Sequence, residues 1–112
     1  MAFCIQCFYR PGGADERFAV RTRHLAHMAA ALPRTIAGGQ LLDDNGAAIG
    51  MFVVLDVPSR RDAEAFMATE PYNVAGLFAT VSIVAARIMT PEPTPGFLQA
   101  ELARQQQADR AG

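Results

Sequence analysis

The sequence has no long hydrophobic run and no excess of charge of one sign. Its 112 residues include ten basic Lys and Arg side chains and eleven acidic ones, with no polybasic or polyacidic stretch. This balance gives no indication of a nucleic acid or an anionic membrane as a partner. No apolar stretch approaches the roughly 18 residues needed to span a bilayer, so we expect no membrane-spanning segment.

Cysteine is scarce as well, since Cys4 and Cys7 are the only two thiols. Their CxxC spacing can indicate redox or metal chemistry, but the pair lies in a run that is typical of a strand. Side chains three positions apart on a strand point to opposite faces, and no second CxxC is present to complete a zinc site. We therefore expect two ordinary thiols, no metal and no cofactor. The first residues also lack the features of a signal peptide, so we expect a cytoplasmic protein.

The chain does have enough apolar residues for one folded domain, because 51% of its residues are hydrophobic and 19% are charged. Periodicity and turn signals predict strands at residues 2–9, 34–42, 47–57 and 77–89 and helices at residues 14–32 and 59–69. Asn45-Gly46 indicates a hairpin between the two middle strands, and Ser59 is a helix cap. The order βαββαβ predicts a ferredoxin-like α+β fold, with a four-stranded antiparallel sheet and both helices on one face.

Both faces of this sheet are expected to be apolar. In the third strand, Met51, Val53 and Leu55 alternate with Phe52 and Val54. An antiparallel sheet with one wet face alternates more cleanly between apolar and polar residues, and two helices cover only one face. We therefore predict a homodimer that packs sheet to sheet through the uncovered face.

Residues 90–112 are expected to form a tail outside the domain of residues 1–89. The first part, TPEPTPG, contains three prolines, which interrupt regular structure. The residues from Phe97 onwards are compatible with a short helix or an extended arm.

The stretch RTRHLAHM, Arg21 to Met28, contains the only two histidines. A helical wheel predicts a buried stripe that consists of Phe18, Thr22, Leu25, Ala29 and Leu32. The neighbouring row on the wheel consists of Arg17, Arg21, His24 and Met28. His24 then lies beside Arg21 at the edge of the core, where partial burial and the arginine both favour the neutral imidazole of a general base. From spacing alone, a structural His24 remains the simpler interpretation. His27 points away from the core and is expected to be solvated.

Three acidic residues and one tyrosine are candidates to act with His24. Asp43 and Asp44 precede Asn-Gly, so they either shape the turn or supply a carboxylate that orients the imidazole. Glu70 either contributes to a pocket or ends the second helix. Tyr72 offers either a phenolic hydroxyl or an apolar lid.

Taken together, residues 1–89 resemble the YCII-related (YciI-like) family. The resemblance rests on four segments in order, namely RTRHLAHM, AGGQLLDDNGAAIG, VPSRRDAEAF and EPYNVAGLF. It implies the ferredoxin-like fold and a homodimer related to the dimeric α+β barrels. It also implies a candidate active site of His24 and a hairpin aspartate, Asp43 with Asp44 as the alternative, beside Arg21.

Two functions remain open on these residues. In the first, the protein is a small cofactor-independent enzyme of lyase or isomerase type, in which His24 acts as general acid and base and Asp43 orients it. Arg21, Glu70 and Tyr72 would then bind a small organic acid. In the second, the protein is a non-catalytic dimeric module that binds a small ligand or regulates a partner. A histidine within hydrogen-bond reach of an aspartate in an open pocket favours the enzyme.

Overall fold

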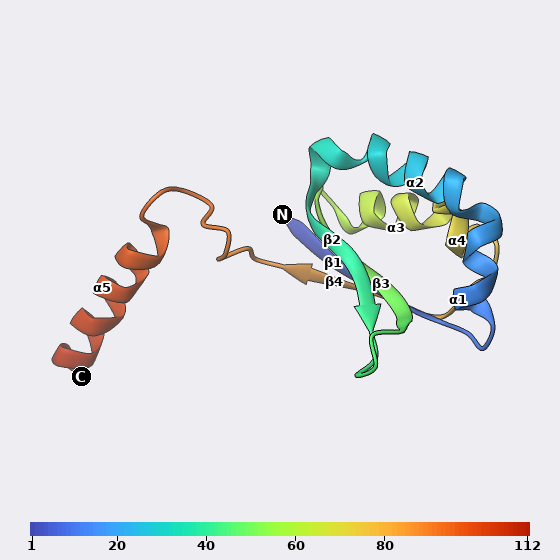
Figure 1. Ribbon diagram of the computed structural model, residues 1–112. Coiled ribbons are helices and arrows are strands. Elements are labelled where there is room, and N and C mark those ends of the chain that lie inside the picture. Colours follow the sequence, from blue (N-terminus) through green and yellow to red (C-terminus); the bar gives the residue numbers. More distant parts are fainter.

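The computed structural model describes all 112 residues and contains one four-stranded antiparallel sheet with helices on one face (Figure 1). The strand order is β2-β3-β1-β4. The strands are β1 (Ala2–Tyr9), β2 (Thr35–Leu42), β3 (Ala48–Asp56) and β4 (Phe78–Ala86). The helices are α1 (Gly13–Glu16), η1 (Arg17–Val20), α2 (Arg21–Ala30), η2 (Leu32–Arg34), α3 (Arg60–Thr69), α4 (Pro71–Val74) and α5 (Phe97–Ala111), where η denotes a 3₁₀ turn. This arrangement confirms the predicted ferredoxin-like α+β fold.

The hydrophobic core lies between the helices and one face of the sheet. Alternate residues of the central strands supply it, because successive side chains of a strand point to opposite faces. The paired positions are Phe3 with Leu55, Ile5 with Val53 and Cys7 with Met51. All six side chains are buried, and Ala63, Phe66 and Met67 of α3 close the core from above.

Local sequence signals account for the turn and the cap that were predicted. Asn45 and Gly46 lie in the β2–β3 turn, where Gly46 adopts a positive φ of 84° that side chains disfavour. The hydroxyl of Ser59 accepts a hydrogen bond from the Asp62 amide and begins α3.

The first helical region differs from the prediction. Instead of one helix over residues 14–32, the chain forms α1, η1 and α2 in succession. A residue in a 3₁₀ turn advances by about 120° rather than about 100°, so η1 shifts the phase of the helical wheel. The expected buried stripe is therefore exposed: Phe18 and Leu32 are 62% and 67% exposed, and Leu25 is exposed too. Val20 and Met28 pack against the core in its place.

The second face of the sheet carries no helix (Figure 1). Cys4 of β1 lies opposite Val54 of β3 on one side and Val84 of β4 on the other. Phe8, four residues further along β1, lies on the same face of the sheet. Phe8 and Val84 are exposed. We call this surface the open face.

After β4 the chain runs past the end of the sheet and forms α5, which projects away from the rest of the molecule (Figure 1). The predicted division into a domain and a tail remains a prediction. None of the helices has the length and apolar character needed to cross a membrane.

Candidate active site

A cavity of about 270 Å³ lies between α2 and the sheet. His24, Arg21 and Met28 of α2 line it, together with Arg17 of η1 and residues of the strands. Tyr72 of α4 and Tyr9 of β1 also line it. Three of the six candidate residues, His24, Arg21 and Tyr72, line this cavity, so it is the candidate site.

His24 is paired with Glu70 and not with a hairpin aspartate. Its Nδ1 lies 2.5 Å from Oε1 of Glu70. The histidine side chain is 13% exposed and that of Glu70 is completely buried. Because a carboxylate only accepts hydrogen bonds, Nδ1 carries the proton in this pair and Nε2 is left as the proton acceptor.

The carboxylate of Glu70 is fixed from its other side. Its Oε2 accepts a hydrogen bond from the Asn73 amide at 3.0 Å, so Glu70 is the N-cap of α4. Pro71 follows it at the first helical position, where its missing N–H costs nothing. The sequence left open whether Glu70 binds substrate or ends a helix. The structure places it behind His24, so the Glu70 carboxylate contacts a residue of the cavity wall without lining the cavity itself.

The imidazole of His24 lies flat on the ring of Tyr72. The ring centroids are 3.8 Å apart and the planes differ by 6°. Tyr9 meets Tyr72 edge to face, with centroids 6.3 Å apart. Burial raises the pKa of both tyrosine hydroxyls, so both stay neutral hydrogen-bond donors at physiological pH.

Two arginines give the cavity its positive charge. Arg21 forms no ion pair with any carboxylate and lies at the first turn of α2. Arg17 lies over the rings of Phe18 and Tyr9, with its guanidinium carbon 4.3 Å and 5.9 Å from their centroids. The cavity therefore offers two cations and, on its walls, no carboxylate that would neutralise them.

Neither hairpin aspartate reaches this cavity within one copy of the chain. Oδ1 of Asp43 accepts hydrogen bonds from the amides of Asn45 at 2.9 Å and Ala47 at 3.0 Å, so its carboxylate stabilises the turn. Asp44 is exposed. Within one copy, the turn itself uses the Asp43 carboxylate, and the His24–aspartate contact that the resemblance implied stays a prediction.

His27 also differs from its prediction as a solvated residue. It is half-buried, its Nε2 lies 3.1 Å from the carbonyl oxygen of Phe66, and its ring packs on the Phe66 ring at 4.6 Å. A carbonyl oxygen accepts, so Nε2 of His27 donates. This contact joins α2 to α3, and the shift in wheel phase at η1 explains why spacing failed to reveal it.

The two cysteines lie on opposite faces of β1, as the strand spacing predicted. Cys7 is buried in the core, and Cys4 is half-buried on the open face. Burial is the larger cause and the nearby charge of Glu70 is the smaller one, and together they raise the pKa of the Cys7 thiol to about 12. No group of three or more His, Cys, Asp or Glu side chains is placed to hold a metal ion.

Comparison with solved structures gives matches of the same fold. The chain is 26% identical to 5-chloro-2-hydroxyhydroquinone dehydrochlorinase (TftG) from Burkholderia phenoliruptrix, a structure in complex with 2,5-dihydroxybenzoquinone. That match has a TM-score of 0.72 and covers 78% of this chain and 94% of the other.

More distant matches share the fold alone. The cofactor-independent oxygenase SnoaB from Streptomyces nogalater is 18% identical, with a TM-score of 0.50 over 81% of this chain and 96% of the other. A protein from Bacteroides thetaiotaomicron that is provisionally described as an antibiotic biosynthesis monooxygenase is 11% identical. That match has a TM-score of 0.52 and covers 84% of this chain and 93% of the other. No curated protein matches. Residues 1–87 match the YCII-related domain, and the chain therefore belongs to the YCII-related family.

Proposed function

We propose that the protein is a small cofactor-independent enzyme that uses His24 as a general acid and base on a small organic acid. The observation that carries this proposal is the His24–Glu70 pair, which is buried on the Glu70 side and opens into the cavity on the His24 side. A histidine that is fixed by a carboxylate and faces a cavity has the geometry of a general base.

The proposed proton transfer uses Nε2 of His24. Nε2 accepts a proton from the substrate, and the carboxylate of Glu70 stabilises the imidazolium that forms. The stacked ring of Tyr72 keeps the imidazole plane fixed, so little reorganisation is needed when the proton moves. Such a base supplies roughly 10²–10⁴ in rate.

The charges in the cavity favour a substrate that becomes more negative as the proton leaves. Arg21 has no carboxylate partner, so its guanidinium is available for a substrate oxygen. The neutral hydroxyls of Tyr9 and Tyr72 are further donors to an enolate or a phenolate. We infer an elimination or an isomerisation, in which the electron pair of the broken bond to hydrogen forms a double bond. In an elimination, the leaving group departs with its own pair.

The comparison with TftG supports an elimination. The name of that protein describes a dehydrochlorination, which removes hydrogen chloride from a hydroxylated ring, and its structure holds a dihydroxybenzoquinone. The cavity of about 270 Å³ in this chain has room for one such ring.

The test measures whether the full chain converts hydroxyhydroquinones, with and without chlorine, or other small hydroxylated acids. The absorbance of the product reports the turnover. For any substrate that is converted, we expect His24→Ala to lose at least a hundredfold in kcat/KM and Asp43→Ala to retain activity. Activity that is equal in His24→Ala and the unsubstituted protein would refute the proposal. Saturable binding without turnover would support the alternative, a ligand-binding module.

We further infer that the protein works as a homodimer, packed through the open face, in the cytoplasm. The exposed apolar side chains of Phe8 and Val84 on that face support the first part. Two free thiols, Cys4 and Cys7, are compatible with a reducing compartment.

A further inference from the structure

The helix α5 has no tertiary support within its own copy. None of its residues is buried, and the exposed apolar side chains include Leu98 and Leu102, one turn apart. The hydrogen bonds of α5 stay within residues 92–112. In Figure 1 it stands clear of the sheet and of every other helix. An isolated helix of 15 residues is marginal in water, so the helix needs a surface to pack on.

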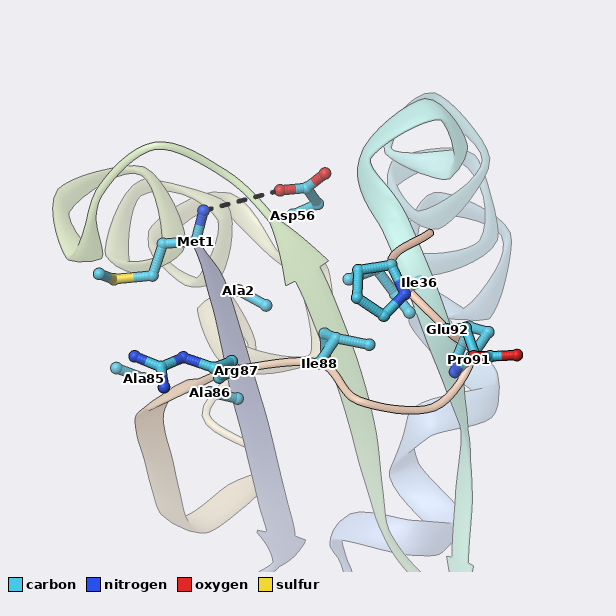
Figure 2. A pocket seen from close by; sticks show the side chains of 11 residues that line it. Met1, Ala2, Ile36, Asp56, Ala85, Ala86, Arg87, Ile88, Pro91 and Glu92 are labelled. Carbon is cyan, nitrogen blue, oxygen red and sulfur yellow. Dashed lines mark ion pairs between the residues drawn. The ribbon is translucent and has the colours of Figure 1, made fainter. Parts of the chain in front are cut away.

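The segment that leads to α5 starts at the open face. Residues 87–93 leave β4 and pass the end of the sheet, where they line one side of an open cavity of about 680 Å³ (Figure 2). Ala2 of β1 and Ile36 of β2 line this cavity from the sheet, and Ile88 and Pro91 line it from the segment. Ala2 shares a face with Cys4 and Phe8, because alternate residues of β1 point the same way. The segment therefore reaches the margin of the open face before α5 begins.

The open face is small in outline. Four strands of eight or nine residues give a face of about 500 Å² in outline, from the usual strand spacing and rise. Stable interfaces bury about 800 Å² per partner. One side of a helix of 15 residues adds about 220 Å² in outline. If the two copies exchange helices, each copy contributes its own helix and also covers the helix of the other copy, so this area counts twice per copy. With both arms included, the outline per copy nearly doubles.

We propose that α5 of each copy crosses to a second copy of this chain and packs there through Leu98 and Leu102. This inference rests on the sheet-to-sheet dimer proposed above and adds the arm to it. The second copy is the occupant because the arm leaves the domain at the margin of the face that the dimer would cover. The charges of α5 are consistent with a second copy as the partner. Its two acidic and two basic side chains cancel, so the helix does not require a partner of opposite charge; they are Glu101, Asp109, Arg104 and Arg110.

Sedimentation equilibrium of the full chain tests the arm with a matched pair of variants. We expect Leu98→Asp/Leu102→Asp to raise the dimer dissociation constant at least tenfold, because it places two charges on the apolar side. The control Ala103→Asp/Gln107→Asp has the same spacing and the same added charge on the opposite side, and it should change the constant less than threefold. Near-ultraviolet circular dichroism of Tyr9 and Tyr72, which both lie in the domain, checks that the two variants keep the domain folded.

A mixed sample of isotope-labelled and unlabelled protein tells whether the contact lies between copies. We expect nuclear Overhauser effects from the methyl groups of Leu98 and Leu102 to residues of the other copy. Equal dissociation constants for the two variants, contacts only within one copy, or a full chain that is monomeric at every concentration would each overturn the arm. Turnover by His24 is measured separately, so loss of the arm and loss of the proposed activity remain distinguishable.

Discussion

The two histidines of α2 lie one turn apart and meet different acceptors. His24 faces the carboxylate of Glu70, whereas His27 faces the backbone carbonyl of Phe66. A carboxylate stabilises an imidazolium that forms during a reaction, but a neutral carbonyl only accepts a hydrogen bond. The comparison shows that the partner, rather than the position on the helix, separates a candidate base from a residue that holds two helices together.

Exchange of each histidine for alanine tests this comparison most directly. We expect His24→Ala to lower kcat/KM by about 10²–10⁴, because the proton acceptor is gone. His27→Ala should change it less than about fivefold, since that ring does not line the cavity. Steady-state kinetics on a converted substrate measure both. Losses of similar size in the two variants would contradict the distinction.

The buried surroundings of Glu70 can be tested through Cys7. Because burial raises the pKa of this thiol from 9.0 to about 12, the unfolded chain loses its proton first as the pH rises. The stabilising contribution is complete below pH 9 and is lost as the pH approaches 12, by up to about 4 kcal/mol in the free energy of unfolding. Urea titrations from pH 8 upwards measure the slope.

The second cysteine supplies the control for that slope. Cys7→Ala should remove most of it, whereas Cys4→Ala, on the opposite face of β1, should leave it unchanged. Part of the slope comes from the charge of Glu70, so Glu70→Gln should reduce it. A slope that survives in Cys7→Ala would assign the pH dependence to other groups.

Glu70→Gln tests the acceptor itself. The substituted side chain keeps one oxygen for the Asn73 amide, and its NH₂ group donates to Nδ1 of His24, which moves the ring proton to Nε2 and removes the free acceptor. We expect a loss of about ten- to a hundredfold in kcat, with a smaller change in KM, and a stability cost of about 1–3 kcal/mol. Glu64→Gln on the exposed side of α3 is the matched control. An unchanged kcat would leave Glu70 with only its capping role.

The smallest effect is expected on the His27 side. His27→Ala should lower the free energy of unfolding by about 1–2 kcal/mol, because it removes one hydrogen bond and the contact with the Phe66 ring. Thermal denaturation measures this change. His27→Gln, whose amide can donate to the same carbonyl, should recover part of it. A loss of activity without a loss of stability would place His27 in the chemistry instead.

Local patterns in the sequence were sufficient for the architecture, but the site depends on distant contacts. Asn45-Gly46 and Ser59 act through neighbours in sequence, so the turn and the cap are predictable. The phase of α2 is set by the 3₁₀ turn at residues 17–20, which a continuous wheel does not represent. His24 and Glu70 are 46 positions apart, and only the folded chain places them together. The residues before Asn-Gly drew attention to Asp43, whose carboxylate the turn itself uses.

The single carboxylate of Glu70 connects the start of α4 to the imidazole of His24. One oxygen begins a helix of only four residues, and the other holds the imidazole. The same turn carries Tyr72, whose buried ring packs in the core against the His24 imidazole. Each local opening of residues 70–74 would therefore also release the His24 ring, so the position of the imidazole depends on the closure of this one turn.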